Sequence, residues 1–259
     1  MRSQNFACVS IDAFAGSGTR TEVRAALPLF ESGADAIEVT SPGSASIAIT
    51  TDLPLDVIVV IEQDDARFAE LEKIVAANPS RRVVLRRGDP NPLVRKLCTE
   101  AQWRKRRGTR GVIFLDPYGM EVDWSTLEAI AATKALDCWY FFPLSGLYRN
   151  APHDPTKLDV HKEAALDRVL GTTDWRQRRY EHKTLPADMF ETEAQATRRA
   201  DIAAIEAYVK ERLETVFKGA VLDPIRLHHK NGAPMASLFF AVSNDSPQAV
   251  RLATEINRS

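Results

Sequence analysis

Five short apolar runs, separated by segments of helical periodicity, constrain the fold of this chain more than any other feature. The runs are Cys8–Ile11, Val57–Ile61, Arg82–Leu85, Gly111–Leu115 and Leu136–Phe142. Apolar runs of this length are typical of parallel strands that helices cover on both faces. Between them, residues such as Phe68, Leu71 and Val75 fall on one stripe of a helix. This alternation predicts an α/β fold with a doubly wound, mostly parallel sheet.

The second half of the chain has a different pattern. Residues 151–200 are polar and rich in charge, which predicts a helical insertion or lid outside the core. An amphipathic helix is expected from Ala200 to Phe217. Two apolar stretches, 220–227 and 235–242, are joined through Lys230-Asn231-Gly232, a signal for an antiparallel hairpin. Five β/α units followed by such a pair fit a Rossmann-like class I methyltransferase fold, as a single domain over residues 1–259.

Residues 21–42 are predicted to be an insertion or flap. Gly16, in the glycine-rich loop after the first predicted strand, and Glu62, the acid at the end of the next strand, are much further apart in the sequence than the ~20 residues typical of such folds. The alternative is a first crossover helix over Glu22–Phe30, but Pro28 would damage its interior. We therefore expect the helix to begin near Gly43-Ser44.

Composition narrows the classes of protein to consider. The 34 basic and 35 acidic residues nearly cancel, and 44% hydrophobic residues are enough for a full core. The three cysteines form no Cys-x-x-Cys pair, so no metal or cluster site is expected; Cys8 and Cys138 lie in apolar runs and are expected to be buried. No apolar stretch reaches the ~18 residues of a membrane span, and no signal sequence is evident. A cytoplasmic protein without membrane contact is the expectation.

The loop Phe14-Ala15-Gly16-Ser17-Gly18-Thr19 follows the first predicted strand. A dinucleotide-binding loop would need a third glycine where Thr21 stands, and no Gly-Lys-Ser/Thr phosphate loop occurs. S-adenosylmethionine, which has no phosphate, requires a small-residue loop and acids at the ends of the next two strands. The candidate cofactor-binding residues are Asp12, Phe14, Ala15, Gly16, Ser17, Gly18, Thr19, Glu62, Gln63 and Asp89.

Asp116-Pro117-Tyr118-Gly119 follows the fourth predicted strand. The string is compatible with a simple turn. It also resembles the Asp-Pro-Pro-aromatic tetrad of enzymes that methylate exocyclic amines of nucleobases, and the Asp-Pro-Phe-Gly of tRNA guanine-N2 methyltransferases. That resemblance implies catalytic roles for Asp116, Pro117 and Tyr118: the carboxylate accepts the amine hydrogens and the aromatic ring stacks on the base. The second proline of the tetrad is absent, and the aromatic residue comes one position early.

Most of the chain also resembles the three-Cys-motif partner protein (TcmP) family. The matching strings are Ile11-Asp12-Ala13-Phe14-Ala15-Gly16-Ser17-Gly18-Thr19, Ile61-Glu62, Phe114-Leu115-Asp116-Pro117-Tyr118-Gly119-Met120, Phe142-Pro143-Leu144-Ser145-Gly146-Leu147 and Ser237-Leu238-Phe239-Phe240-Ala241-Val242-Ser243-Asn244. The resemblance implies a methyltransferase-like fold in a bacterial or phage protein. It also implies a partner, a radical-SAM-like protein that carries the three-cysteine motif.

Basic residues are concentrated between Arg81 and Arg110, with Arg104-Lys105-Arg106-Arg107 as the densest part. Such a run is usually a solvated surface; alternatively, it binds the phosphates of RNA or DNA beside the catalytic tip, with Trp103 stacking on a base. Three functions therefore stay open at this point: an S-adenosylmethionine-dependent N-methyltransferase, a catalytically silent partner protein, and a metal-dependent nucleic-acid enzyme using Asp12, Glu62, Asp89 and Asp116.

Overall fold

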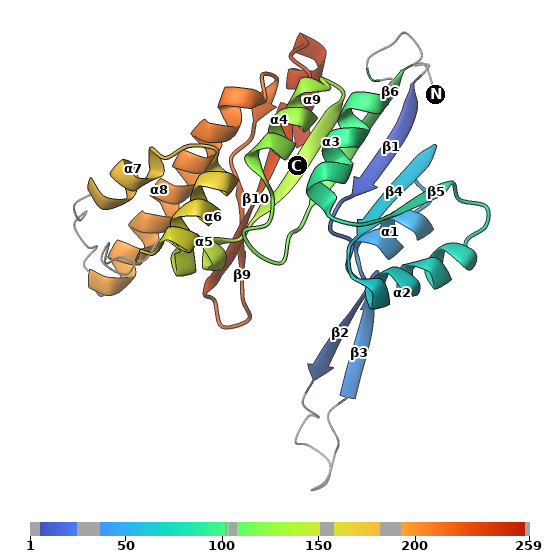
Figure 1. Ribbon diagram of the computed structural model, residues 1–259, viewed down its shortest axis with the longest axis horizontal. Coiled ribbons are helices and arrows are strands. Elements are labelled where there is room, and N and C mark those ends of the chain that lie inside the picture. The colour runs from blue at the N-terminus through green and yellow to red at the C-terminus, as the bar shows by residue number, and fades with distance from the viewer. Residues whose placement is uncertain are drawn as a thin grey trace, which may run out of the picture.

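A computed structural model describes residues 6–24, 37–101, 103, 108–150, 158–181 and 193–256, which fold around one eight-stranded sheet (Figure 1). The strands lie in the order β5 (Val83–Arg87), β4 (Val57–Glu62), β1 (Ala7–Asp12), β6 (Thr109–Leu115), β7 (Leu136–Phe142), β10 (Pro234–Val242) and β8 (Ala220–Val221), with β9 (Ile225–His228) also paired to β10. The first five are parallel, and β10 is antiparallel to β7, β8 and β9. This is the strand order of the class I methyltransferase fold, so the predicted α/β architecture and its C-terminal antiparallel pair are confirmed.

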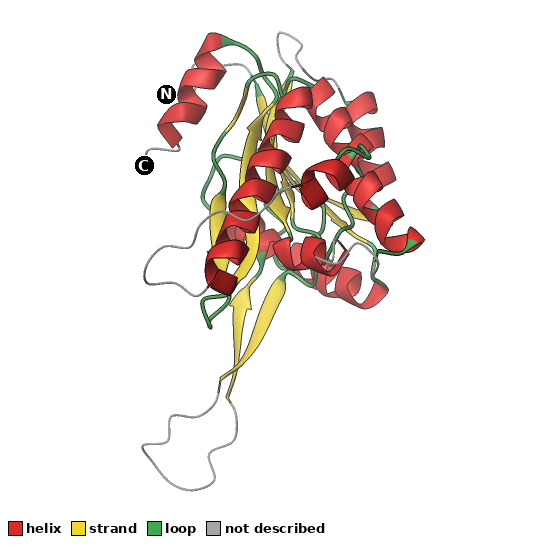
Figure 2. Ribbon diagram, turned by 90° about the vertical axis from the view of Figure 1, so that its left-hand side faces the viewer, coloured by secondary structure: helices red, strands yellow, loops and turns green. Residues whose placement is uncertain are grey.

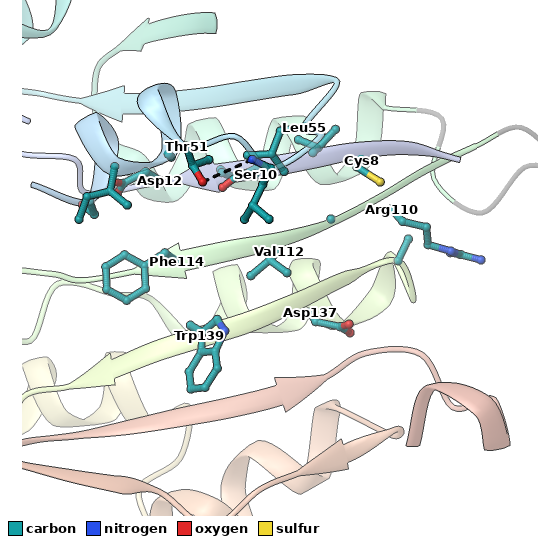
Figure 3. A pocket seen from close by; sticks show the side chains of 18 of the residues that line it. Cys8, Ser10, Asp12, Thr51, Leu55, Arg110, Val112, Phe114, Asp137 and Trp139 are labelled. Carbon is teal, nitrogen blue, oxygen red and sulfur yellow. Dashed lines mark hydrogen bonds between the residues drawn. The ribbon is translucent and has the colours of Figure 1, made fainter. Parts of the chain in front are cut away.

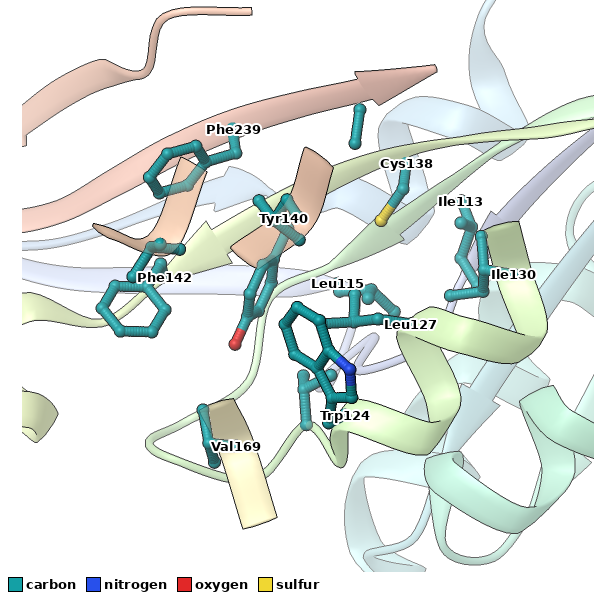
Figure 4. Packing of buried hydrophobic residues seen from close by; sticks show 14 of the residues in the cluster. Ile113, Leu115, Trp124, Leu127, Ile130, Cys138, Tyr140, Phe142, Val169 and Phe239 are labelled. Atoms are coloured by element: carbon teal, nitrogen blue, oxygen red, sulfur yellow. The ribbon is translucent and has the colours of Figure 1, made fainter. Parts of the chain in front are cut away.

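Helices cover both faces of the sheet, and each face has its own hydrophobic core (Figure 2). The smaller core lies under α1 (Ser44–Thr50) and α2 (Asp65–Ala76), whose Ile49 and Leu71 pack with Ile58 of β4. The larger core lies under α3 (Pro90–Glu100), α4 (Trp124–Ala132), α5 (Leu144–Asn150) and α8 (Glu193–Val216). Figure 4 shows Ile113 and Leu115 of β6 packed against Leu127 and Ile130 of α4. Among the described residues, none of the helices is both long and apolar enough to cross a membrane.

The region expected to be a polar insertion, residues 151–200, contributes to the larger core where the structure describes it. The helices α6 (Val160–Leu170) and α7 (Trp175–Glu181) occur here. Leu166, Val169 and Trp175 are buried in that core. The segment is therefore helical, but its described part is a packed layer of the fold rather than a region outside the core. A role as a lid stays a prediction.

Residues 19–24 and 37–42, between the glycine loop and the first crossover helix, lie outside the main sheet. The strands β2 (Thr19–Arg24) and β3 (Ile37–Pro42) pair antiparallel as a separate two-stranded ribbon, which projects away from the main sheet (Figure 1). Gly43 donates its N–H to the carbonyl of Gly18 at 2.8 Å, and the Ser46 hydroxyl donates to the same carbonyl. The two ends of the ribbon are thus joined at the glycine loop, and α1 begins at Ser44, as Pro28 led us to expect.

On one face of the sheet, residues of β1, β6 and β7 border an open groove. Figure 3 shows Ser10, Val112, Phe114 and Trp139 along this face, where they line a groove of about 710 Å³. Val112 is 38% exposed although β6 is a central strand. Cys8 lies on the same face and is exposed, so the expectation of a buried Cys8 is wrong. Cys138 points to the opposite face and is buried as expected; desolvation raises the pKa of its thiol.

Candidate functional site

A crevice of about 660 Å³ lies at the carboxyl ends of the parallel strands. Its volume is within the ~300–1,000 Å³ usual for small-molecule sites. Of the residues singled out from the sequence, seven line it: Phe14, Gly16, Glu62, Gln63, Asp116, Pro117 and Tyr118. The glycine loop and the Asp116 string, about a hundred positions apart in the chain, therefore face one cavity because β1 and β6 are neighbouring parallel strands.

The glycine loop is held open by two residues with left-handed backbone. Gly16 has φ +62° and Gly18 has φ +72°, a region that side chains with a Cβ rarely adopt. A Cβ on Gly18 would lie 2.7 Å from Cδ1 of Ile74, so a side chain here would displace the end of Ile74 in addition to straining the backbone. A Cβ on Gly16 would meet no atom within 4 Å. Gly16 thus leaves open space beside backbone, which is the kind of surface that lets a ligand approach the main chain closely.

Glu62 fastens the loop to the end of β4. Its Oε2 accepts the N–H of Gly16 at 2.8 Å, and its Oε1 accepts the N–H groups of Gln63 and Asp64 at 2.9 and 2.8 Å. A carboxylate has about four acceptor positions. Three are filled by backbone here, and Glu62 is only 4% exposed. In this conformation Glu62 has one acceptor position left for a ligand hydroxyl, and its main effect is to fix the loop.

Asp12 is almost fully buried. It is 3% exposed, and no described donor reaches its carboxylate oxygens with full hydrogen-bond geometry, although the Ser44 side chain and the Phe14 backbone lie close enough to lower its pKa. Burial, together with the nearby charges of Asp116 and Glu62, raises its pKa from 3.8 to about 6. Asp12 lines the groove of Figure 3 rather than the crevice.

The Asp116 string is exposed at the end of β6, and the residues after it are firmly held. Tyr118 is 92% exposed, and Pro117 is buried. The buried Asn91 donates from Nδ2 to the carbonyl of Glu121 at 2.9 Å and accepts the N–H of Asp123 at 2.9 Å. Arg168 of α6 donates to the carbonyl of Met120 at 2.7 Å. An exposed aromatic ring on a fixed loop offers a stacking surface for a planar ligand.

Other predicted residues lie outside the crevice. Asp89 caps α3 by accepting the N–H of Asn91 at 2.9 Å, and Pro90 lines the crevice in its place. The Ser17 hydroxyl donates to the carbonyl of Thr19 at 2.9 Å. Ala15 is buried. The carboxylates Asp12, Glu62, Asp89 and Asp116 do not gather into a metal-binding group in the described part of the chain.

The basic stretch Arg104–Arg107 falls outside the described residues, but its flanks are described. Trp103 forms an isolated parallel β-bridge with Thr109, at the amino end of β6, whereas Asp116 follows the carboxyl end of that strand. The strand of 7 residues separates these positions by ~20 Å. Trp103 packs partly buried against the core and donates its indole N–H to the carbonyl of Leu97 at 3.2 Å. The expectation that Trp103 stacks on a base beside the catalytic tip is therefore wrong.

Sequence reasoning missed one wall of the crevice. It is lined by Phe141, Pro143 and Ser145, from the end of β7 and the start of α5, and by His229 and Met235, from the β9–β10 hairpin. The string Phe142-Pro143-Leu144-Ser145 was available as a signal, because it follows a strand in the same way as the two strings used above. Nothing in the local pattern of the hairpin indicates that its turn reaches the crevice.

No family model matches the chain, and no curated protein matches it in sequence. Among solved structures, a Legionella pneumophila protein assigned to the family model DUF519 aligns with 96% of this chain and 82% of its own, at 13% identity and a TM-score of 0.48. The TYW2 protein of M. jannaschii, solved in complex with AdoMet, aligns with 90% of this chain and 67% of its own, at 11% identity and a TM-score of 0.33. The fold assignment rests on the strand order described above, and these alignments add nothing about the site.

Proposed function

We propose that this protein is an S-adenosylmethionine-dependent N-methyltransferase that acts on an exocyclic amine of a nucleobase. The observation that carries the proposal is that one crevice contains both the open backbone at Gly16 and the Asp116-Pro117-Tyr118 tip, of which Asp116 and Tyr118 are exposed. The first offers a place for the cofactor and the second a place for the acceptor. A methyl donor and an acceptor must be adjacent for direct transfer.

The charges around the crevice fit a cationic cofactor. The carboxylates of Glu62, Asp116 and Glu121 line it together with the guanidinium of Arg67, so acidic groups outnumber basic ones, and Asp12 lies close enough for its pKa to respond to Glu62 and Asp116. S-adenosylmethionine carries a sulfonium and an ammonium group and supplies an electrophilic methyl group. An uncompensated buried carboxylate such as Asp12 costs stability without a ligand, and a nearby positive charge lowers that cost. Gly16 would lie against the cofactor, and Glu62 would accept one ribose hydroxyl hydrogen.

Asp116 would orient the acceptor. The lone pair of an exocyclic amine is delocalised into its ring, so the amine is a poor nucleophile. A carboxylate that accepts one of its hydrogens favours a pyramidal nitrogen, whose lone pair can then form the new N–C bond as the C–S bond breaks. The amine afterwards loses one proton to water. Tyr118 would stack on the ring and hold it in place.

The acceptor molecule and the partner protein also belong to this proposal. A base within RNA or DNA is proposed as the acceptor, because the tip resembles those of nucleobase-methylating enzymes. The three-cysteine protein stays a proposed partner on the strength of the TcmP resemblance alone. The metal-dependent alternative lacks a gathered set of carboxylate ligands in the described residues.

Single-turnover methylation with bound cofactor tests the proposal. Asp116→Ala is expected to lower the rate by about two orders of magnitude or more, as for other groups aligned with charge that develops in the transition state. Cofactor affinity should change little, because Asp116 acts mainly on the acceptor. The matched control is Glu121→Ala, which removes another crevice carboxylate. If Asp116→Ala methylates at the wild-type rate, Asp116-Pro117-Tyr118-Gly119 is only a turn, and the amine-directed mechanism is wrong.

A further inference from the structure

The β9–β10 hairpin ends in a well-defined turn beside the crevice. The N–H of His229 donates to the carbonyl of Ala233 at 2.8 Å, and the N–H of Gly232 donates to the carbonyl of His229 at 2.8 Å. Gly232 has φ +79°, which the turn requires. His229 is therefore fixed by its backbone at both N–H and carbonyl, while its exposed imidazole lines the crevice.

A buried acidic group anchors the same hairpin to α8. Glu206 of α8 is 9% exposed and accepts hydrogen bonds from the guanidinium of Arg226 on β9, one of them at 3.0 Å. The hydroxyl of Ser237 on β10 donates to Glu206 at 2.7 Å. Charge-assisted bonds of this kind are stronger than neutral ones. Both strands of the hairpin are thus held against the body of the protein, close to its turn.

The register of the hairpin shifts at Met235. Pro234 pairs with His228 and Ala236 pairs with Leu227, so Met235 is an extra residue on β10 without a partner on β9. In regular alternation Met235 would share a face with Ser237, which points to α8. A bulge re-aims the side chain of its extra residue, and such bulges are frequent beside active sites. Met235 lines the crevice instead.

We infer that the end of this hairpin is the specificity-determining wall of the acceptor site, with Met235 packing on the face of the acceptor ring and His229 hydrogen-bonding its edge. This inference rests on the proposed function, since it assigns a second wall to the same crevice. Tyr118 and Phe141 offer flat aromatic surfaces to the crevice, and Met235 offers a polarizable thioether. Both kinds of surface suit a heteroaromatic ring. An imidazole carries one donor and one acceptor in its neutral form, which suits the polar edge of a base.

The adjacent histidines provide a matched control. His228 is the last residue of β9, is exposed, and does not line the crevice. Neither substitution removes a backbone hydrogen bond of the turn, so His228→Ala and His229→Ala should fold alike. His229→Ala is expected to weaken binding of an acceptor nucleoside by about fivefold, the value of one net hydrogen bond. His228→Ala should change it less than twofold.

The test uses the full chain labelled with ¹³C at the methionine methyl groups, of which the sequence has 4. In the presence of S-adenosylhomocysteine, adenosine, guanosine and cytidine are titrated, and uridine, which has no exocyclic amine, is the comparison ligand. A ring stacked on Met235 shifts its methyl resonance, which is assigned from the spectrum of Met235→Ala. Calorimetry with S-adenosylhomocysteine alone measures cofactor binding separately.

A saturable shift of the Met235 resonance, weakened in His229→Ala and retained in His228→Ala, supports the inference. A protein that binds S-adenosylhomocysteine but shows no response of Met235 to any of the nucleosides overturns this inference alone and leaves the cofactor site standing. Equal effects of the two histidine substitutions also overturn it. A protein that does not bind S-adenosylhomocysteine overturns the proposed function, and the inference with it.

Discussion

Replacing Asp12 by asparagine is expected to change how the stability of the protein depends on pH. Asp12 is buried, no described donor reaches its carboxylate with full hydrogen-bond geometry, and its pKa in the folded protein is about 6 instead of 3.8. Between these two pH values the folded chain keeps a proton that the unfolded chain has released. The free energy of unfolding therefore falls as pH rises from 3.8 to 6 and stays lower above 6.

The size of this loss follows from the pKa of Asp12, which is about 6 in the folded protein and 3.8 in the unfolded chain. A difference of one pKa unit corresponds to about 1.4 kcal/mol. The charged Asp12 thus costs about 3 kcal/mol at neutral pH compared with its protonated form. Asp12→Asn has nearly the same shape and no charge at any pH. The difference in unfolding free energy, variant minus wild type, should rise by about 2.4 kcal/mol between pH 4 and pH 7, because part of the total change falls below pH 4.

Urea denaturation of both proteins at a series of pH values measures this difference. Asp52→Asn is the control, because Asp52 is an exposed aspartate that follows α1; the difference between this variant and the wild type should stay nearly flat. If the curve for Asp12→Asn also stays flat, Asp12 is not an uncompensated buried carboxylate, and the electrostatic reason for a cationic ligand is lost.

Two further predictions concern packing. Ile113 is fully buried, and its neighbour Val112 lines the open groove. In urea denaturation, Ile113→Ala should therefore lower the free energy of unfolding by about 2–5 kcal/mol and Val112→Ala by less than about 1 kcal/mol. Similar losses at both positions would show that a helix or partner covers the groove. Gly18→Ala should cost about 1–2 kcal/mol from its left-handed backbone alone, with more from the contact with Ile74. Gly119→Ala, whose Cβ meets no atom within 4 Å, should cost little, and equal losses would refute this account of the loop.

The sequence predicted the sheet because its parallel strands appear as continuous apolar runs. Of these strands, β4 is buried almost throughout, whereas one face of β1, β6 and β7 borders the groove of Figure 3. The start of α1 at Ser44 was also predictable, since Pro28 excluded the only earlier helical segment. The core contribution of α6 was not, because its buried stripe of Leu166 and Val169 is short and lies among charged residues. The average polarity of such a segment is easily read from its sequence, whereas two buried apolar residues among many charged ones are easily missed.

The site was predictable only in part, and the reason is again physical. Residues that directly follow a parallel strand, such as Asp116, must lie at the carboxyl edge of the sheet. The hydrogen bonds of Glu62 to three backbone N–H groups depend on the conformation of the loop, which its residue types do not specify. His229 and Met235 reach the crevice through a turn and a bulge on a strand that is remote in the sequence. Likewise, Cys8 is exposed because it borders the open groove over β1, β6 and β7.

Calorimetry with S-adenosylmethionine and S-adenosylhomocysteine tests the central claim most directly. We expect saturable binding of one molecule per chain. Binding should be lost in Gly16→Arg, which fills the open space beside the loop, and weakened in Glu62→Ala, which releases the loop from β4. Gly119→Ala should bind as the wild type does. Absence of binding by the folded wild-type protein at ligand concentrations on the order of 1 mM, where even weak sites are occupied, would contradict the account.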